Sequence, residues 1–319
     1  MRAILCRGYG GSDQLIEAEV PVPQPAPTQL LIRVAASSVN PIDWKLYSGR
    51  YRWLMPMRFP FIPGFDVAGE VTEVGAQVTR FKPGDPIFAM LDTRSGGASA
   101  EYMVVGELAV APIPGNMPAF EAAALPLAGL TALQALRDLG QVGAGKHVLI
   151  VGASGGVGHF AVQIAKSYGA QVTAVCSSPH VDMVRGLGAD HVIDYTKQPD
   201  FGSTQAYDIV LDLVVQQSVR EFFPLVASDG IYVSSLPSAD RVAAIFLLPF
   251  YSKRRVRIVR VRPSGEDLDQ LRTLCEAGKL RPVIDRVFRL EELAAAHVYN
   301  QRGSTAGKIV IRLGNELSP

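Results

Sequence analysis

The chain contains one glycine-rich segment that could hold a phosphate group. It reads Gly152-Ala153-Ser154-Gly155-Gly156-Val157-Gly158. An apolar run, 146–151, precedes it, and a helical pattern that ends at Gly169 follows it. Glycines placed in this way let the backbone approach a pyrophosphate, while the start of the helix adds N–H donors and positive potential. Although Ala153 replaces the first glycine of G-x-G-x-x-G, the segment indicates a dinucleotide site. The alternative is a glycine-rich turn in a sheet that has lost its ligand.

The residues that follow the next expected strand, 171–176, indicate which dinucleotide binds. The strand is followed by Ser177 and Ser178, and no acidic residue occurs before Asp182. An Asp or Glu at this point would accept hydrogen bonds from the ribose 2′-hydroxyl and repel a 2′-phosphate. The sequence therefore favours NADPH over NADH, with Ser177, Ser178 and His180 as donors to the phosphate. Alternatively, Ser178 only caps the helix that Pro179 begins.

From about residue 118 helical patterns alternate with short apolar strands. The expected strands are 146–151, 171–176, 191–195, 208–213, 230–235 and 256–261. Six strands joined by helical crossovers predict an α/β fold with a doubly wound parallel sheet, the Rossmann arrangement.

The first 117 residues instead read as short extended segments divided by Gly and Pro, which predicts a β-rich domain. Beyond Pro263 the pattern is a helix from Ser264 to Gly278, a strand over 283–288, a helix over 290–301 and a strand over 308–313. These last strands lack a partner in the six-stranded sheet. We therefore expect one domain of residues 1–117 and 264–319, and a second of residues 118–263.

Composition limits the classes of function. A length of 319 residues suits about two domains. The 31 Lys and Arg side chains nearly balance 30 Asp and Glu, so no global field would hold nucleic acid. Three distant cysteines suggest a reducing compartment. The longest apolar run, 242–251, is too short to cross a bilayer, and Met1 to Gly10 lacks a signal-peptide pattern, so we expect a cytoplasmic protein.

Several further motifs resemble one family in its order along the chain. They are Ser38-Val39-Asn40-Pro41-Ile42-Asp43-Trp44-Lys45, Pro63-Gly64-Phe65-Asp66-Val67-Ala68-Gly69-Glu70-Val71, Val74-Gly75, Lys82-Pro83-Gly84-Asp85, Leu125-Pro126-Leu127-Ala128-Gly129-Leu130-Thr131-Ala132, Gly188-Ala189-Asp190, Ile193-Asp194-Tyr195 and Gly307-Lys308-Ile309-Val310. With the glycine-rich segment, they resemble the zinc-free medium-chain dehydrogenase/reductases, in the quinone oxidoreductase and enone reductase branch. The resemblance covers essentially the whole chain.

The resemblance implies a GroES-like β-rich catalytic domain, completed by the C-terminus, beside a Rossmann domain, with the active site in the crevice between them. Zinc-dependent relatives carry a Cys ligand near Ser38, a Gly-His-Glu motif at Gly64-Phe65-Asp66 and a four-cysteine lobe, none of which is present in this sequence. The five histidines show no metal-ligand spacing, so no metal is expected.

Without zinc, the chemistry must suit a positioned nicotinamide and hydrogen-bond donors. Hydride transfer to a quinone or an α,β-unsaturated carbonyl develops negative charge on oxygen, which such donors stabilise. By family analogy, Asn40 is the first candidate near substrate and nicotinamide, or else only a turn residue before Pro41. Asp43 and Lys45 follow, and Lys45 would donate to the substrate carbonyl unless it is a solvated lysine. Tyr51 is a weaker candidate proton donor.

The resemblance also adds cofactor residues. Thr131 corresponds to a threonine near the nicotinamide, and Tyr195 to a tyrosine near the adenosine phosphate; otherwise they are an ordinary helix residue and a strand-end aromatic. His180 aligns with a lysine that binds the 2′-phosphate in some relatives. A neutral imidazole would hold the phosphate less firmly, so the cofactor preference would be weaker.

The segment 253–262 carries six cations among apolar residues. We interpret it as a sheet strand with charged flanks at a dimer edge, and not as a nucleic-acid site. The hypothesis is an NADPH-dependent homodimeric reductase of a small apolar electrophile. The alternatives are an enoyl-thioester reductase and a non-catalytic redox sensor or nucleic-acid-binding protein that retains the nucleotide fold.

Overall fold

The chain is divided into two compact units in a computed structural model that describes residues 1–53, 55–92, 96–198 and 206–313. Unit 1 comprises Met1–Leu130, Arg262–Gly278 and the chain from Pro282 onward, and unit 2 comprises Thr131–Val261 with Lys279–Arg281. The first boundary therefore falls at Leu130 instead of residue 117. The physical reason is that the short helix α2 (Ala119–Ala122) contacts strands of the unit 1 sheet.

Unit 2 contains the predicted six-stranded parallel sheet. Its strands are β8 (His147–Val151), β9 (Gln171–Cys176), β10 (His191–Asp194), β11 (Tyr207–Asp212), β12 (Val226–Ser234) and β13 (Arg255–Ile258). The spatial order is β10-β9-β8-β11-β12-β13, with every neighbouring pair parallel. This order reverses direction between β8 and β11, which is where doubly wound sheets bind their ligands. The edge strand β13 is shorter than the predicted range 256–261.

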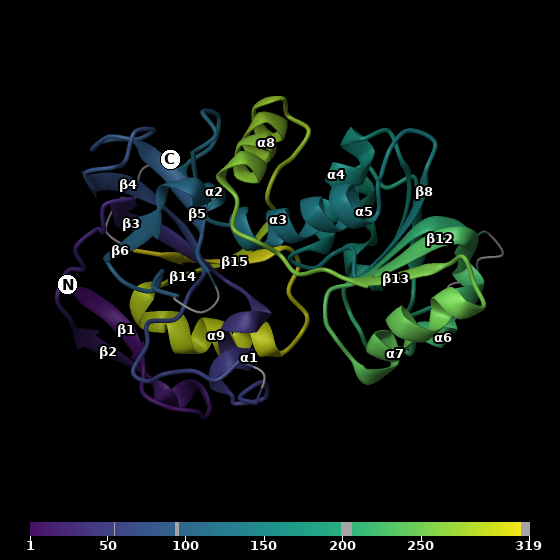
Figure 1. Ribbon diagram of the computed structural model, residues 1–319, viewed down its shortest axis with the longest axis horizontal. Helices are drawn as coiled ribbons and strands as arrows, with labels where there is room; N and C mark the ends of the chain where they lie inside the picture. Colours follow the sequence, from purple (N-terminus) through teal and green to yellow (C-terminus); the bar gives the residue numbers. More distant parts are fainter. Residues whose placement is uncertain (54, 93–95, 199–205, 314–319) are drawn as a thin grey trace. The chain divides into compact units, whose positions relative to one another are not determined.

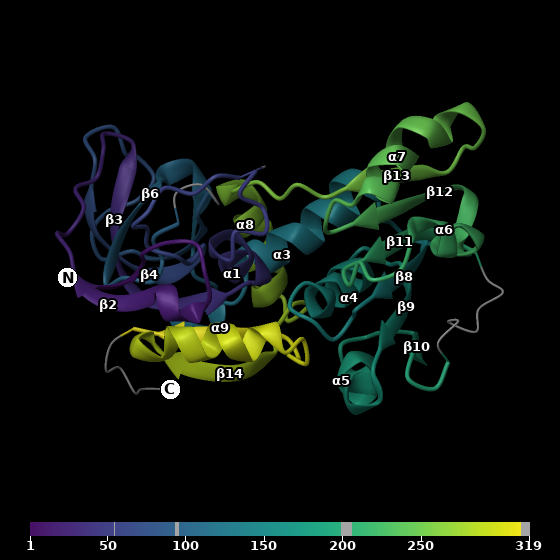
Figure 2. The same ribbon diagram turned by 90° about the horizontal axis from the view of Figure 1, so that it is seen from below.

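Helices cover both faces of this sheet. They are α4 (Gly158–Ser167), α5 (Val181–Gly186), α6 (Val219–Phe222) and α7 (Ala239–Leu247), with 3-10 turns η4 (Ser178–His180), η5 (Phe223–Leu225) and η6 (Leu248–Phe250). Figures 1 and 2 show α4 and α5 on one face and α6 and α7 on the other. Because both faces are covered, the central strands are apolar throughout, and Val148, Leu149 and Ile150 have no exposed surface. The unit boundary lies inside α3 (Pro126–Gln134), which continues as the π-helical turn η3 (Ala135–Leu139).

Unit 1 is built on a seven-stranded sheet to which both parts of the chain contribute. Its strands are β3 (Gln29–Val39), β4 (Asp66–Val74), β5 (Pro86–Met90), β6 (Tyr102–Gly106), β7 (Val110–Pro112), β14 (Ile284–Arg289) and β15 (Lys308–Arg312). The C-terminal β15 lies between β14 and β3 and is antiparallel to β3. The prediction that the unpaired C-terminal strands return to the first domain is thus confirmed. A separate two-stranded sheet joins β1 (Arg2–Cys6) to β2 (Leu15–Glu19).

The remaining unit 1 helices include α8, whose ends carry the residues that the sequence indicated. They are α1 (Pro41–Tyr47), α8 (Gly265–Glu276) and α9 (Leu293–Gln301), with 3-10 turns η1 (Ser12–Gln14), η2 (Glu107–Ala109) and η7 (Leu290–Glu292). The Ser264 hydroxyl accepts a hydrogen bond from the Asp267 N–H at 3.1 Å, which caps α8, and Gly278 follows its end at φ +67°. In α1, Trp44 Nε1 donates to Asn300 Oδ1 at 3.0 Å, which ties α1 to α9.

No helix in the described ranges is long and apolar enough to cross a membrane.

Candidate functional site

The glycine-rich segment forms a tight turn between β8 and α4. Gly152 adopts φ +84°, which favours glycine. A Cβ on Gly158 would lie 2.1 Å from the Gly152 carbonyl oxygen, so the protein's own packing requires glycine there. A Cβ on Gly155 would meet only that same oxygen, at 3.4 Å, which is ordinary contact. The room beside Gly155 is therefore not needed for packing and suits an approaching ligand.

The turn also presents hydrogen-bond donors without acceptors. Val157 precedes α4 without a side-chain cap, and the N–H groups of Ser154, Gly156 and Val157 have no backbone acceptor among the described residues. Residues 154–157 are partly exposed. The N–H of buried Ala153 instead donates to the Val175 carbonyl at 3.0 Å, so Ala153 holds the turn against β9. Free N–H groups at a helix N-terminus fit the pyrophosphate of a dinucleotide.

The predicted 2′-phosphate residues follow β9. Ser177 precedes η4, and Ser178 and His180 lie within it, so the expectation that Ser178 caps the helix is wrong. The Ser178 hydroxyl contacts Asp194 Oδ2 at 2.5 Å and Thr196 Oγ1 at 2.8 Å. Asp194 was overlooked because it ends β10, not β9. The parallel register places it opposite Cys176, the last residue of β9.

The other two family-derived cofactor residues are both in unit 2. Tyr195 follows Asp194 and is half exposed, which leaves its ring available to a ligand. Thr131 is buried in α3 and begins unit 2.

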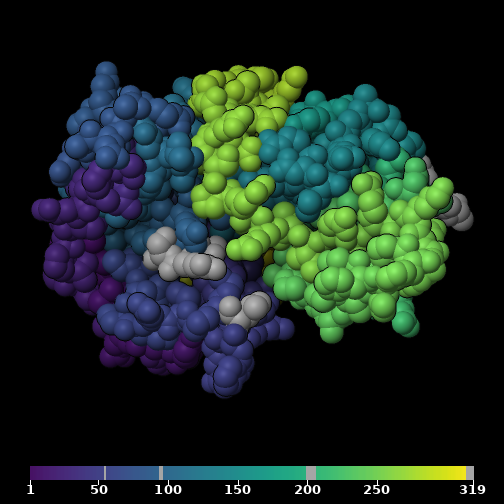
Figure 3. Space-filling view, viewed as in Figure 1, coloured from purple at the N-terminus to yellow at the C-terminus, as the bar shows by residue number. Residues whose placement is uncertain are grey.

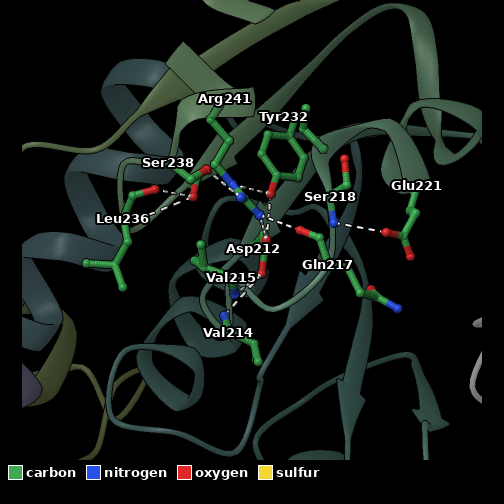
Figure 4. A network of polar contacts seen from close by, with 12 residues as sticks. Asp212, Val214, Val215, Gln217, Ser218, Glu221, Tyr232, Leu236, Ser238 and Arg241 are labelled. Carbon is green, nitrogen blue, oxygen red and sulfur yellow. Dashed lines mark hydrogen bonds and ion pairs between the residues drawn. The ribbon is translucent and has the colours of Figure 1, made fainter. Parts of the chain in front are cut away.

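A buried ion pair at the end of β11 was also missed from sequence. Asp212 lies opposite Val151 in the register with β8, so the loop after β11 begins beside the glycine-rich turn. The Asp212 carboxylate accepts from Arg241 Nη2 at 3.0 Å, and its other oxygen accepts from the N–H groups of Val214 at 3.1 Å and Val215 at 3.0 Å (Figure 4). This pair fixes a loop in which Val215 has the unusual φ of +60°.

Arg241 completes that network from α7. It donates to the Ser238 hydroxyl at 2.7 Å, the Gln217 carbonyl at 2.8 Å and the Tyr232 hydroxyl at 3.1 Å (Figure 4). Burial, followed by the nearby Asp212 charge, raises the pKa of Tyr232, so its phenol stays protonated and donates to Asp212. The only sequence signal was Asp212 at the end of an apolar strand.

In unit 1, Asn40 belongs to a buried polar cluster. Its Nδ2 donates to Asp66 Oδ2 at 2.8 Å, and its Oδ1 accepts from Lys308 Nζ at 2.6 Å. Because lysine only donates and a carboxylate only accepts, these partners fix which way the amide points. Ser38 Oγ also donates to Asp66 Oδ2, at 2.6 Å. Both ends of the Asn40 amide are thus engaged within the protein.

Strand register explains why these residues meet. Ser38 on β3 pairs with Asp66 on β4, and Val39 on β3 pairs with Ile309 on β15, next to Lys308. The Lys308 ammonium also contacts the Val39 carbonyl at 3.2 Å and Asp66 Oδ2 at 3.3 Å, while both charged side chains are at most 3% exposed. The remaining Asp66 oxygen accepts from the N–H of Leu127 at 2.7 Å, at the start of α3.

Asp43 lies at the edge of this cluster. Its Oδ2 accepts from the Asn40 N–H at 2.6 Å, while its buried Oδ1 has no partner among the described residues. Burial, with a smaller contribution from the Asp66 charge, raises the pKa of Asp43 to about 8. The carboxyl group is therefore mostly neutral at neutral pH and retains a proton that it could donate.

The other two predicted catalytic residues lie outside the cluster. Lys45 is half buried on α1, with its ammonium 5.5 Å from the centre of the Trp44 ring. Burial, with a smaller contribution from Arg50, lowers the pKa of Lys45. Tyr51 follows α1 in a partly exposed turn. The structure thus brings together Asn40 and Asp43, and adds Ser38, Asp66 and Lys308.

The donor set at the aligned zinc-ligand positions does not fit zinc. Ser38 and Asp66 supply a hydroxyl and a carboxylate, and Phe65 supplies no ligand. The Lys308 ammonium already lies against the carboxylate and would repel a divalent cation. Among the residues described, no group of three His, Cys, Asp or Glu side chains is arranged to hold a metal ion.

Two families match parts of the sequence. Residues 26–115 match the family described as "Alcohol dehydrogenase GroES-like domain", and residues 187–311 match the family described as "Zinc-binding dehydrogenase". The first range lies in unit 1 and the second extends over parts of both units.

Characterised relatives extend over nearly the whole chain. The chain is 40% identical over 324 residues to the chloroplastic quinone oxidoreductase QR1 of Triphysaria versicolor, covering 98% of each. It is 36% identical over 322 residues to 2-methylene-furan-3-one reductase of Solanum lycopersicum, covering 98% of this chain and 79% of the relative.

Solved structures share the fold. A quinone oxidoreductase from Coxiella burnetii has a TM-score of 0.88 at 30% identity, covering 98% of this chain and 99% of that one. A structure described as an NAD-dependent alcohol dehydrogenase has a TM-score of 0.86 at 30% identity, covering 98% of this chain and 100% of that one. The predicted combination of a GroES-like sheet and a Rossmann sheet is thereby confirmed.

Replacing Lys308 should destabilise unit 1. Lys308→Met leaves the Asp66 carboxylate buried without its counter-charge, which should lower the free energy of unfolding by about 3–5 kcal/mol. Both tryptophans, Trp44 and Trp53, lie in unit 1, so urea unfolding followed by tryptophan fluorescence measures this. The control is Arg33→Met, which breaks the half-exposed pair with Glu70 and should change stability by less than about 1 kcal/mol. Equal losses in the two variants would contradict the assignment.

Asp43 should make stability fall as pH rises. Its pKa lies near 8 in the folded protein and at the ordinary 3.8 when exposed, so between these values only the folded state keeps the proton. The free energy of unfolding of the wild type, relative to that of Asp43→Asn, should therefore decrease from pH 5 to pH 8. Urea titrations at both pH values measure it, with the exposed Asp13→Asn as control. A pH slope unchanged in Asp43→Asn would show that Asp43 ionises normally.

Proposed function

Because the chain belongs to the medium-chain dehydrogenase/reductase superfamily, we propose that it is an NADPH-dependent, zinc-independent reductase of quinones or α,β-unsaturated carbonyl compounds. The observation that carries this proposal is the turn at Gly155, where the backbone leaves room and free N–H groups that internal packing does not use. The names of the relatives, a quinone oxidoreductase and a reductase of an unsaturated furanone, support the acceptor class.

A nicotinamide dinucleotide, when bound, would supply a hydride to the acceptor. The protein must then stabilise negative charge on the acceptor oxygen and deliver a proton. Lys45 is proposed to donate to that oxygen, since its lowered pKa eases proton release. Asp43, neutral in the folded protein, and Tyr51 are the other proposed proton donors. Asn40, fixed by Lys308 and Asp66, is proposed to orient the substrate side of the site.

The proposed cofactor residues belong to unit 2. The N–H groups of Ser154, Gly156 and Val157 would bind the pyrophosphate, and Ser177, Ser178, His180 and Tyr195 would surround the adenosine end. Thr131 is proposed near the nicotinamide. Zinc independence is supported by the Lys308 ammonium beside Asp66.

Unit 1 contains a groove, and Asn40, Asp43, Lys45 and Tyr51 are not among the residues that line it. Its volume is about 680 Å³, and its lining is mainly apolar, including Phe61, Ile62 and Met90.

A turnover panel tests the proposal. Metal-stripped protein should oxidise NADPH with a quinone or a short enone, whereas preference for an enoyl thioester would favour the alternative reductase. Gly155→Ala should weaken dinucleotide binding by about tenfold without unfolding the protein, because its Cβ has room in the fold. Gly143→Ala, with no atom within 4 Å of the added Cβ, is the control. NADPH binding without turnover on any acceptor would instead favour the redox sensor.

We also propose a homodimer. The edge strand β13 has one neighbour in its sheet, and the adjoining α7 and η6 expose Phe246, Leu247 and Phe250, with Phe250 86% exposed. This green segment lies open on the face drawn in Figure 3. An apolar patch beside an unpaired edge suits a second copy of the chain.

Light scattering should give about twice the 34.3 kDa chain mass, and Phe250→Asp should halve the measured mass. A monomeric wild type would refute the dimer.

The cytoplasmic location stays a prediction from sequence. The relative QR1 is described as chloroplastic, which does not support a cytoplasmic location.

A further inference from the structure

The carboxyl end of β10 brings an acidic side chain to the adenosine end of the nucleotide site. In dinucleotide-binding sheets, the ribose 2′ position lies at the carboxyl end of the second strand, which here is β9. Asp194 is paired with Cys176 at that end, and the Tyr195 N–H donates to the Cys176 carbonyl at 3.1 Å. The acidic residue that sequence analysis did not find on β9 is thus supplied by the neighbouring strand β10.

Asp194 also changes what Ser178 can offer a ligand. A hydroxyl has one hydrogen, and the Ser178 hydroxyl donates it to Asp194 Oδ2 at 2.5 Å. Thr196 Oγ1 likewise donates to Asp194 Oδ1 at 2.6 Å. The two hydroxyls also lie 2.8 Å apart, where either can donate to the other, so both hydrogens are used within this group and only lone pairs are left for a ligand. A 2′-phosphate would meet acceptors there, not donors.

The neighbouring cationic side chains already form ion pairs with acidic side chains. Lys197 Nζ lies 3.4 Å from Asp194 Oδ2, and Arg185 Nη1 lies 2.8 Å from Asp182 Oδ1. Ser177, His180 and Tyr195 remain as donors to a phosphate. A 2′-hydroxyl, in contrast, could donate to the Asp194 carboxylate.

We propose that Asp194 is the residue that sets the cofactor preference. This inference rests on the proposed function. Asp194 disfavours the 2′-phosphate and accepts from a 2′-hydroxyl, so that the preference of this chain for NADPH over NADH is weak. Neutralising Asp194 makes the protein a stricter NADPH enzyme.

Nucleotide binding tests this without turnover. The probes are 2′,5′-ADP and 5′-AMP, which differ by the 2′-phosphate, and titration calorimetry gives the ratio of their dissociation constants. In Asp194→Asn the ratio should shift toward 2′,5′-ADP by about fivefold or more. Asp229→Asn, an exposed carboxylate on β12, should leave the ratio unchanged. The ratio of kcat/KM values for NADPH and NADH should move in parallel.

Two further variants guard against a folding defect and test the opposite change in charge. Asp194→Ser is a second neutral replacement if Asp194→Asn does not fold, and Lys197→Gln should shift the ratio in the opposite direction. If the wild type binds both nucleotides and neutral variants keep its ratio, Asp194 does not set the preference, while the proposed function stands. If the folded wild type binds neither nucleotide, both proposals are wrong.

Discussion

The Lys308 ammonium and the Asp66 carboxylate form an ion pair inside unit 1, and much of that unit's organisation is arranged around it. Removing two charges from water is unfavourable unless each is paired and its remaining hydrogen-bonding capacity is filled. Here the ammonium has three acceptors, and the carboxylate has donors from Ser38, Asn40 and the start of α3. The pair therefore joins β3, β4 and β15 and sets the orientation of the Asn40 amide.

Unit 2 also buries an ion pair, at the end of β11. Asp212 and Arg241 are at most 3% exposed, and their partners are backbone groups and hydroxyls of the surrounding loops. In both units the buried pair lies at a strand terminus, where an irregular segment adjoins the strand: Asp212 is the last residue of β11, and Asp66 and Lys308 are the first residues of β4 and β15. Such segments have few backbone partners of their own, so a charged group that accepts or donates several bonds can fix their shape.

Much of the fold could be predicted because its signals are local. Alternating helical and apolar segments indicated the six-stranded sheet, and Gly152 to Gly158 marked the nucleotide turn. The return of β15 to unit 1 followed from strands that had no partner elsewhere. Lys308, Asp194 and Arg241 could not be assigned from sequence, because their roles depend on neighbours that only the strand register reveals. Lys308 was seen only within the Gly307-Lys308 motif, and Asp194 within Ile193-Asp194-Tyr195.

The boundary at Leu130 shows the same limit, since α2 reads as the start of a helical domain yet contacts the sheet of unit 1. The ranges expected for the first two strands of the Rossmann unit, by contrast, agree closely with β8 and β9. Short elements that pack across a domain boundary are thus the least predictable part of this chain.

The placement of β15 has a consequence for biogenesis. Residues 36–39 of β3, which pair with β15, have no permanent neighbour on that side until the ribosome has made Lys308, 268 residues after Asn40, whereas β6 pairs with residues 29–33 earlier. All six strands of unit 2 are synthesised within that interval, so unit 2 can fold while unit 1 still lacks a strand. An unfinished sheet edge can pair with other nascent chains. Chaperone capture of the nascent protein should therefore be concentrated on its amino-terminal third.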